Sequence, residues 1–152
     1  ADAISEYLRR VRGCVEVGLR VRYSVEDVFA LFVERHRELA HARDRYFADG
    51  REPSRQEKIE LGQLFQKILQ AERAEHLARL TEGLEEHCTE ILANDPRSEE
   101  EVANLAILVR RDGVDALEDA IHAVAEDFED HFTFNYTDEL APYSFVDLQL
   151  DM

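Results

Sequence analysis

The stretch LGQLFQKILQAERAEHLARL, residues 61–80, carries apolar side chains at the spacing of one helical face. This pattern predicts a helix with a single buried stripe. Continued at about 100° per residue, the stripe reaches Glu72, with Glu75 and His76 on either side of it. A carboxylate that points into a core is costly unless it is paired, protonated or bound to a metal ion. Either the core opens to solvent at this point, or Glu72 and His76 have a partner.

Helical patterns continue on both sides of this stretch. Glycine and proline are scarce, and the alternation typical of strands is nearly absent before the C-terminus. Ser24, Ser54 and Ser98 each precede an acid by three residues, the arrangement that caps the start of a helix. The expected helices cover residues 2–21, 25–47, 55–92, 99–110 and 114–134. We therefore predict an all-α fold, an up-down four-helix bundle with an additional N-terminal or short helix.

The length of the chain, 152 residues, corresponds to one ordinary domain. We assign residues 1–140 to a single helical-bundle domain. Residues 141–152 are expected to form an extended C-terminal tail, because apolar and polar residues alternate over residues 146–152. We expect a homo-oligomer, a dimer, with this tail or a face along the first helix as its contact surface.

Charge and cysteine content restrict the classes of partner and compartment. The formal net charge of −16 disfavours binding to nucleic acid and to anionic membrane surfaces. No apolar run approaches the ~18 residues that a membrane-spanning helix needs. Cys14 and Cys88 lie far apart and form no CxxC pair, which favours reduced thiols in a cytosol. Because no signal peptide is visible either, we expect a cytoplasmic protein.

Metal binding is one interpretation of the polar site. Helical bundles can hold metal ions between their helices through carboxylates and imidazoles that project inward. On the expected helical faces, Glu72 is central and His76 lies beside it. His36 and His131 lie on the flanks of the inward faces of two other helices. These four residues are the candidate ligands for iron or another divalent metal, and no catalytic residue is assigned.

An ion pair is the alternative interpretation of Glu72. Arg35 and Arg43 also lie close to the inward face of their helix, where either could supply a counter-charge. A buried carboxylate that is paired with a guanidinium needs no metal ion. The nearest neighbours of the Glu72 carboxylate distinguish the two interpretations, and the sequence leaves both open.

Three segments resemble the ferritin-like superfamily, and rubrerythrin-like proteins in particular. They are ELAHARDRYFA (38–48), QLFQKILQAERAEHLARL (63–80) and DALEDAIHAVAEDFEDHF (115–132). The resemblance implies a four-helix bundle that binds a pair of metal ions, usually iron, and that handles oxygen or peroxide or stores iron. The ligand pattern is degenerate, because Glu72 and His76 are four residues apart where the family has three. Leu39 and Val124 stand where the family places metal-binding glutamates.

A second resemblance connects FVERHRELAHARD (32–44) and FEDHFTF (128–134) with hemerythrin-like proteins, which also bind two irons in a helical bundle. The sequence therefore leads to three functional hypotheses. The first is a ferritin-like protein that binds iron for redox chemistry or storage; if it is an enzyme, it would be a metal-dependent oxidoreductase. The others are a metal-free helical interaction or scaffold protein and a hemerythrin-like metal-binding protein.

Overall fold

The computed structural model describes residues 3–128, 130–140 and 145, and of residues 7, 49 and 138–140 it describes the backbone alone. The fold mixes helices with one four-stranded antiparallel sheet, in which the strand order is β2-β3-β1-β4. The strands are β1 (Cys14–Tyr23), β2 (Glu90–Asn94), β3 (Glu101–Arg110) and β4 (Phe132–Leu140). The α-helices are α1 (Ala3–Val11), α2 (Val28–Arg35), α3 (Arg37–Tyr46), α4 (Arg55–Leu84) and α5 (Val114–Asp127). Short 3-10 helices occupy η1 (Ala48–Gly50), η2 (Glu85–His87) and η3 (Arg111–Gly113).

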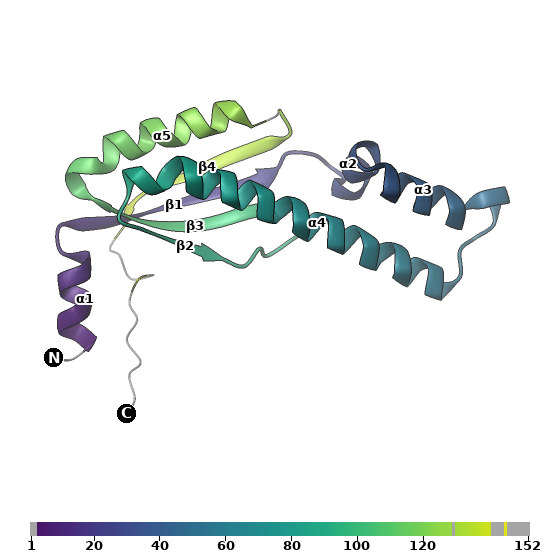
Figure 1. Cartoon of the computed structure of the whole chain (residues 1–152), viewed down its shortest axis with the longest axis horizontal. Helices are drawn as coiled ribbons and strands as arrows, with labels where there is room; N and C mark the ends of the chain where they lie inside the picture. The colour runs from purple at the N-terminus through teal and green to yellow at the C-terminus, as the bar shows by residue number, and fades with distance from the viewer. Residues whose placement is uncertain (1–2, 129, 141–144, 146–152) are drawn as a thin grey trace.

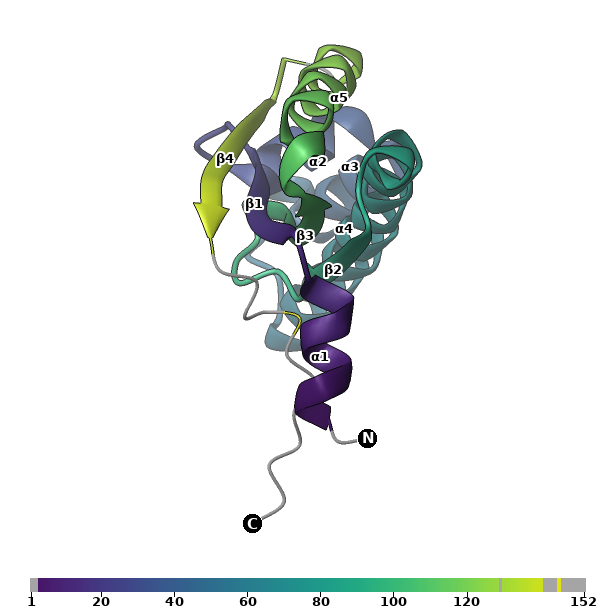
Figure 2. The ribbon, with the colours of Figure 1, turned by 90° about the vertical axis from the view of Figure 1, so that its left-hand side faces the viewer.

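The core lies between the sheet and two helices. Helices α4 and α5 pack side by side on the same face of the sheet (Figure 2). Alternate residues of β1 and β3 point toward them, as in the cross-strand pairs Val17–Ile107 and Leu19–Leu105. All four of these side chains are almost completely buried, so this layer supplies most of the hydrophobic stabilisation.

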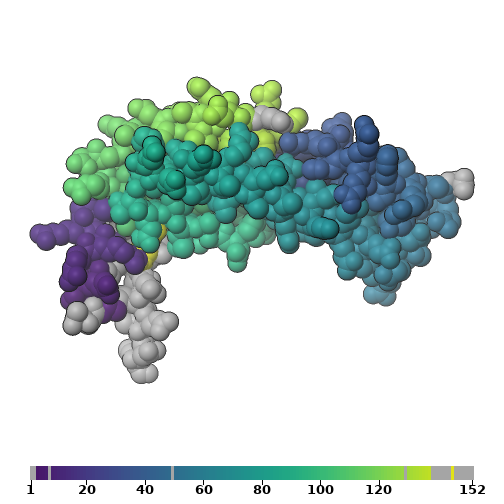
Figure 3. Space-filling view, in the orientation of Figure 1, coloured from purple at the N-terminus to yellow at the C-terminus, as the bar shows by residue number. Residues whose placement is uncertain are grey.

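A helical arm extends the molecule beyond the sheet. Helix α4 has 30 residues, about 45 Å at 1.5 Å per residue, and only its C-terminal half covers the sheet (Figure 1). Helices α2 and α3 pack against its N-terminal half, and we call residues 28–69 the helical arm. In the space-filling view the surface of α4 continues from this arm onto the body of the molecule (Figure 3).

The predicted all-α four-helix bundle is wrong. The expected helix at 2–21 contains α1 and then all of β1 up to Arg20. The break comes at Gly13, whose φ of 73° is favourable only for glycine and ends the helix. Beyond it Val15, Val17, Leu19 and Val21 alternate with more polar residues, which is the period of a strand.

The expected helix at 99–110 is also wrong, because it is the strand β3. This strand reads EVANLAILVR and is buried on both faces. One face meets α4 and α5, and the other packs Ala106 and Leu108 against Val11, Cys14 and Phe145. A strand buried on both faces shows a continuous apolar run, which periodicity alone cannot separate from a buried helix.

The remaining helices differ from the prediction mainly at their ends. Ser54 and Glu57 form the predicted capping box at the start of α4, so that start is confirmed. Helix α4 ends at Leu84, and the rest of the expected helix becomes η2 and β2. The expected helix at 25–47 is divided at His36 into α2 and α3, and its cap is Asp27, which accepts from the Ala30 amide.

The predicted C-terminal tail, residues 141–152, lies outside the described residues apart from Phe145, which is buried. The division of the chain at residue 140 therefore stays a prediction.

Candidate functional site

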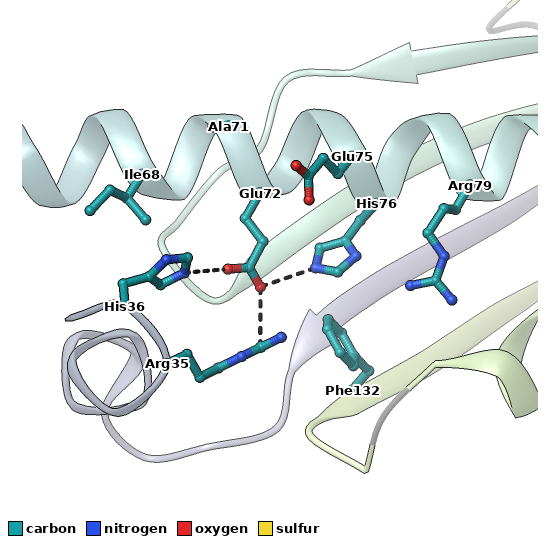
Figure 4. Close-up of a pocket in the computed structure, with 9 residues that line it drawn as sticks. All are labelled: Arg35, His36, Ile68, Ala71, Glu72, Glu75, His76, Arg79 and Phe132. Atoms are coloured by element: carbon teal, nitrogen blue, oxygen red, sulfur yellow. Dashed lines mark hydrogen bonds and ion pairs between the residues drawn. The ribbon is translucent and has the colours of Figure 1, made fainter. Parts of the chain in front are cut away.

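Glu72 lies at the junction of the arm and the sheet. It belongs to the buried side of α4, together with Phe65, Leu69 and His76, and is 7% exposed. The predicted burial of Glu72 and His76 is therefore confirmed. A pocket of about 470 Å³ opens beside it (Figure 4). Arg35 lies on the wall of this pocket that faces Glu72, and Arg79 lies at one end of the pocket.

Four side chains from three elements converge on the Glu72 carboxylate. Arg35 Nη1 lies 3.1 Å from Oε1, and His76 Nε2 lies 3.1 Å from the same oxygen. His36 Nε2 lies 2.9 Å from Oε2. The Tyr23 hydroxyl, at the end of β1, donates to Oε1 at 3.4 Å. Both carboxylate oxygens are therefore occupied, and the cluster fastens β1 and the end of α2 to α4.

Burial and these contacts act on the pKa of Glu72 in opposite directions. Burial by itself raises the pKa, because it disfavours the charged form. Hydrogen bonds from His76 and His36 and the nearby Arg35 guanidinium lower it further than burial raises it, to about 2. The carboxylate is thus ionised at neutral pH and can only accept hydrogen bonds, so Nε2 of each imidazole carries the donated proton. Burial and the Glu72 carboxylate also raise the pKa of Tyr23, which keeps its hydroxyl a donor.

Acid should weaken this cluster in a defined pH range. The folded-state pKa of Glu72 is below its ordinary value of 4.5, so its contribution to stability is complete above about pH 5. That contribution is lost as the pH falls toward 2, where the carboxylate becomes protonated in the folded state too. We expect the unfolding free energies of the native protein and of Glu72→Gln to differ most at pH 7 and to converge between pH 5 and 2. Urea titrations across this range measure the difference, and a pH-independent difference would contradict the assignment.

His76 is enclosed by aromatic rings. Its imidazole lies 4.9 Å from the Phe132 ring and 5.4 Å from the Phe128 ring, between centroids. Arg79 stacks over Phe128 at 4.4 Å, which closes this side of the pocket. His76 Nδ1 is buried and has no hydrogen-bond partner among the described residues. The ring is therefore positioned by apolar contacts on one edge and by Glu72 on the other.

The structure brings together three of the four candidate ligands. Glu72, His76 and His36 are in contact, whereas His131 is exposed in the turn before β4 and does not line the pocket. The predicted alternative, an ion pair between Glu72 and Arg35, is confirmed. Arg43 instead pairs with its neighbour Asp44.

Tyr23 was not predicted as part of the site, and its position follows from the strand β1. Its side chain lies on the helix-facing side of that strand, which the helical interpretation of residues 2–21 could not reveal. The alternation of apolar residues from Val15 to Tyr23 was the signal that could have found it.

The arrangement supports structural electrostatics better than metal chemistry. No group of three or more His, Cys, Asp or Glu in the described part of the chain is arranged to hold a metal ion. Arg35 lies close to Glu72 Oε1, where a cation bound to that oxygen would be repelled. Iron or another divalent metal at Glu72, His76, His36 and His131 stays a prediction, which metal analysis of the purified protein would test.

The thiols are also poorly suited to chemistry. Cys14 is buried, and Cys88 is half-buried. Burial raises the pKa of Cys88 to about 11, with the Glu85 carboxylate contributing. Little of this thiol is therefore thiolate at neutral pH, the form that acts as a nucleophile.

Within the described part of the chain, no helix is both long and apolar enough to cross a membrane.

Comparison with known proteins identifies one family. The family model described as gas vesicle synthesis protein GvpL/GvpF matches residues 1–147. Gas vesicle protein F of Dolichospermum flosaquae is 24% identical over 147 residues, which cover 97% of this chain and 59% of the relative. Gas vesicle protein F of Haloferax mediterranei is 40% identical over 57 residues, 38% of this chain and 27% of the relative.

Two solved structures share the fold. The crystal structure of GvpF from Anabaena sp. PCC7120 has a TM-score of 0.81 and 21% identity, and covers 95% of this chain and 59% of its own. GvpF from Microcystis aeruginosa has a TM-score of 0.75 with the same identity and coverage. The chain thus spans about three-fifths of the length of these relatives. The resemblance to rubrerythrin-like proteins is wrong, since both the family model and the sheet contradict a ferritin-like bundle.

Proposed function

Because this chain belongs to the GvpL/GvpF family of gas vesicle synthesis proteins, we propose that it acts in gas vesicle formation as a non-catalytic protein that binds other gas vesicle proteins. The family match over residues 1–147 is the observation that carries this proposal. It replaces the predicted ferritin-like function in redox chemistry or iron storage. Of the three hypotheses from the sequence, the metal-free interaction protein is nearest to this proposal. The all-helical fold that this hypothesis assumed is wrong.

The site supports binding rather than catalysis. Both oxygens of the Glu72 carboxylate are occupied by Arg35, His36, His76 and Tyr23, so this carboxylate has little capacity to act on a substrate. These contacts connect β1 and the end of α2 to α4. We propose that the cluster holds the helical arm at a set angle to the sheet.

Exposed apolar side chains supply contact surface at both ends of the molecule. Phe47 is 50% exposed and Ile59 is 43% exposed on the helical arm. Ile4 and Leu8 are 52% and 58% exposed on α1, at the opposite end (Figure 1). Apolar side chains gathered on a surface are typical of protein interfaces. An elongated protein with such positions at each end is suited to contact two partners.

Deletion and complementation in the host test the proposed function. We expect deletion of the coding sequence to abolish or strongly reduce gas vesicles, as seen by electron microscopy and by turbidity that collapses under pressure. Expression of the 152-residue chain in the deletion strain should restore them. The Glu75→Ala variant, altered at an exposed residue beside the site, should restore gas vesicles as fully as the unaltered chain does. Unchanged vesicle numbers in the deletion strain would overturn the proposal.

We also propose a cytoplasmic location and a homodimer, both expected from the sequence. Fractionation of host cells tests the location, and light scattering of the purified chain tests the dimer. A membrane-bound fraction or a monomeric mass at micromolar concentration would overturn these two proposals.

A further inference from the structure

Helix α1 carries an apolar stripe that is buried only at its last residue. Ile4, Leu8 and Val11 share one side of the helix, because they are four and three residues apart. Val11 packs against the sheet face opposite α4 and α5, whereas Ile4 and Leu8 are 52% and 58% exposed. The helix projects from one end of the sheet (Figure 2), so the described part of the chain leaves about half of each of these two side chains uncovered.

The chain returns to α1 at Phe145. This side chain is 4% exposed and packs in the same cluster as Val11. The Arg10 guanidinium donates to the Phe145 carbonyl oxygen. Because Val11 is the last residue of α1, these contacts hold Phe145 at the C-terminal end of the helix. We call Phe145 the anchor.

The sequence after the anchor complements the exposed stripe. Residues 146–152 read VDLQLDM and lie outside the described part of the chain. Apolar residues alternate with polar ones, so an extended conformation would present the valine, both leucines and the methionine along one side. From Val11 back to Ile4, seven residues of helix measure about 10 Å. Three to four extended residues span the same distance, so this segment is long enough to reach Ile4.

Charge favours the approach of this segment to α1. Residues 3–12 include three arginines, Arg9, Arg10 and Arg12, and a single acid, in a chain whose net charge is −16. Arg10 also pairs with Glu90 at 3.5 Å. The segment 146–152 has two aspartates and no basic residue, so it is attracted to this end of the molecule.

The size of the exposed stripe favours a tethered occupant. Two half-exposed side chains offer far less area than the ~800 Å² per partner that a stable protein–protein interface buries. The stripe alone is therefore too small to hold a second copy of the chain. A segment that is already held at the anchor has a high effective concentration at α1, so a few apolar contacts are sufficient.

We propose that residues 146–152 bind along α1 of the same chain, antiparallel to the helix, and cover Ile4 and Leu8 with their alternate apolar side chains. The inference rests on the proposed function for its biological meaning, because α1 is one of the two contact surfaces proposed there. A partner that binds α1 would have to displace this segment, so the segment would control access to that surface.

Disulfide formation between engineered cysteines tests the contact. The full chain with Cys88→Ser serves as background, and Cys14, which is buried, is left in place. Ile4→Cys is combined with Leu148→Cys, since both positions are about 10 Å from the anchor along the helix and along an extended segment. Cysteine is itself a small apolar residue, so the contact is retained. With oxidised glutathione we expect a bridged monomer, identified by non-reducing electrophoresis and mass spectrometry.

Glu6→Cys with Leu148→Cys is the matched control. Glu6 is also exposed on α1, but at about 100° per residue it faces away from the apolar stripe. Its effective concentration near Leu148 is therefore lower, and the bridge should form at least about tenfold more slowly than with Ile4→Cys.

Hydrogen exchange tests the same contact without added cysteines. Leu148→Ser should make the amides of α1 exchange at least about threefold faster than in the unaltered chain, because the covering segment no longer stabilises the helix. Gln149→Ser alters the neighbouring position, whose side chain would point away from α1 in an extended segment. Its exchange rates should stay within about twofold of those of the unaltered chain.

Three outcomes would overturn the inference: equal bridging rates at Ile4 and Glu6, disulfide-linked dimers in place of bridged monomers, or unchanged exchange in Leu148→Ser. Linked dimers would assign the stripe on α1 to a second copy of the chain. None of these outcomes affects the deletion experiment, which tests the proposed function without reference to α1. Conversely, a bridged monomer from a chain whose deletion leaves vesicles unchanged would retain the contact and reject its role in gas vesicle formation.

Discussion

Replacing Glu72 with alanine is expected to lower the free energy of unfolding by about 2–3 kcal/mol. The loss is large because the change removes the acceptor of a buried hydrogen-bonding cluster and leaves the buried donors of His76 and Tyr23 without a partner. Arg35, His36 and His76 would lose the carboxylate that each contacts within 3.1 Å. His76, which is buried, would keep its desolvation cost without the hydrogen bond that offset it, whereas Arg35 and His36 are partly exposed and can turn to water.

Urea unfolding at pH 7, followed by circular dichroism, measures this effect. Glu75→Ala is the matched control, since Glu75 lies on the same helix and lines the same pocket but is exposed. Its unfolding free energy should change by no more than about 0.5 kcal/mol. Equal losses in the two variants would show that the cluster around Glu72 contributes no more than a surface carboxylate does.

Replacing Gly83 with alanine is expected to destabilise the protein by about 2 kcal/mol, although alanine is the better helix former. Gly83 faces Val124 across the contact between α4 and α5. A Cβ at this position would overlap Val124 Cγ2, well inside van der Waals contact. Val124 is β-branched and has restricted χ1 freedom, so relief of the clash requires the two helices to separate or the valine to change rotamer.

A second glycine in the same helix provides the control. A Cβ added at Gly62 would meet no atom within 4 Å, so Gly62→Ala should stabilise the protein by about 0.5–1 kcal/mol. Combining Gly83→Ala with Val124→Ala should recover most of the loss, because the second change removes the methyl group that clashes. If Gly62→Ala and Gly83→Ala shift the urea midpoint in the same direction, the helices are not in close contact at this point.

Val124 and Leu39 show why the family resemblance predicted from the sequence was wrong. Val124 stood where a ferritin-like protein would place a metal-binding glutamate, and its actual role is to contact Gly83 between α4 and α5. Leu39, the other such position, is completely buried in the hydrophobic core. Both residues pack in or against the hydrophobic core, which accounts for their apolar side chains.

Some features of the site were predictable from local patterns. The apolar stripe of α4 and its capping box at Ser54 depend on residues within one helix, where spacing determines which side chains share a face. The burial of Glu72 followed from the same spacing. The cost of burying a carboxylate then required a partner, and Arg35 was one of two arginines at a suitable helical position.

The cluster around Glu72 shows how far such reasoning extends. Spacing placed His36 on the flank of its helix, but the break at His36 decided that its imidazole would reach Glu72 Oε2. Tyr23 belongs to the cluster because it is the last residue of β1 and that end of the strand lies beside α4. Contacts between elements distant in sequence depend on the topology of the fold. The spacing of residues within one helix carries no information about that topology.

By itself, the sequence determined where α4 begins, which side of it is buried, and that a carboxylate on that side needs a counter-charge, a metal ion or access to solvent. It did not determine whether residues 14–23 and 101–110 are helices or strands. Residues 101–110 are buried on both faces and satisfy either periodicity, so their own residues do not decide between the two. In residues 15–23 the apolar positions alternate, which is the pattern of a strand. The tertiary structure decided it, because β1 and β3 pair their backbones with each other and with the neighbouring strands β4 and β2. The same sheet brings Tyr23, at the end of β1, to the Glu72 carboxylate, a contact that the sequence alone did not indicate.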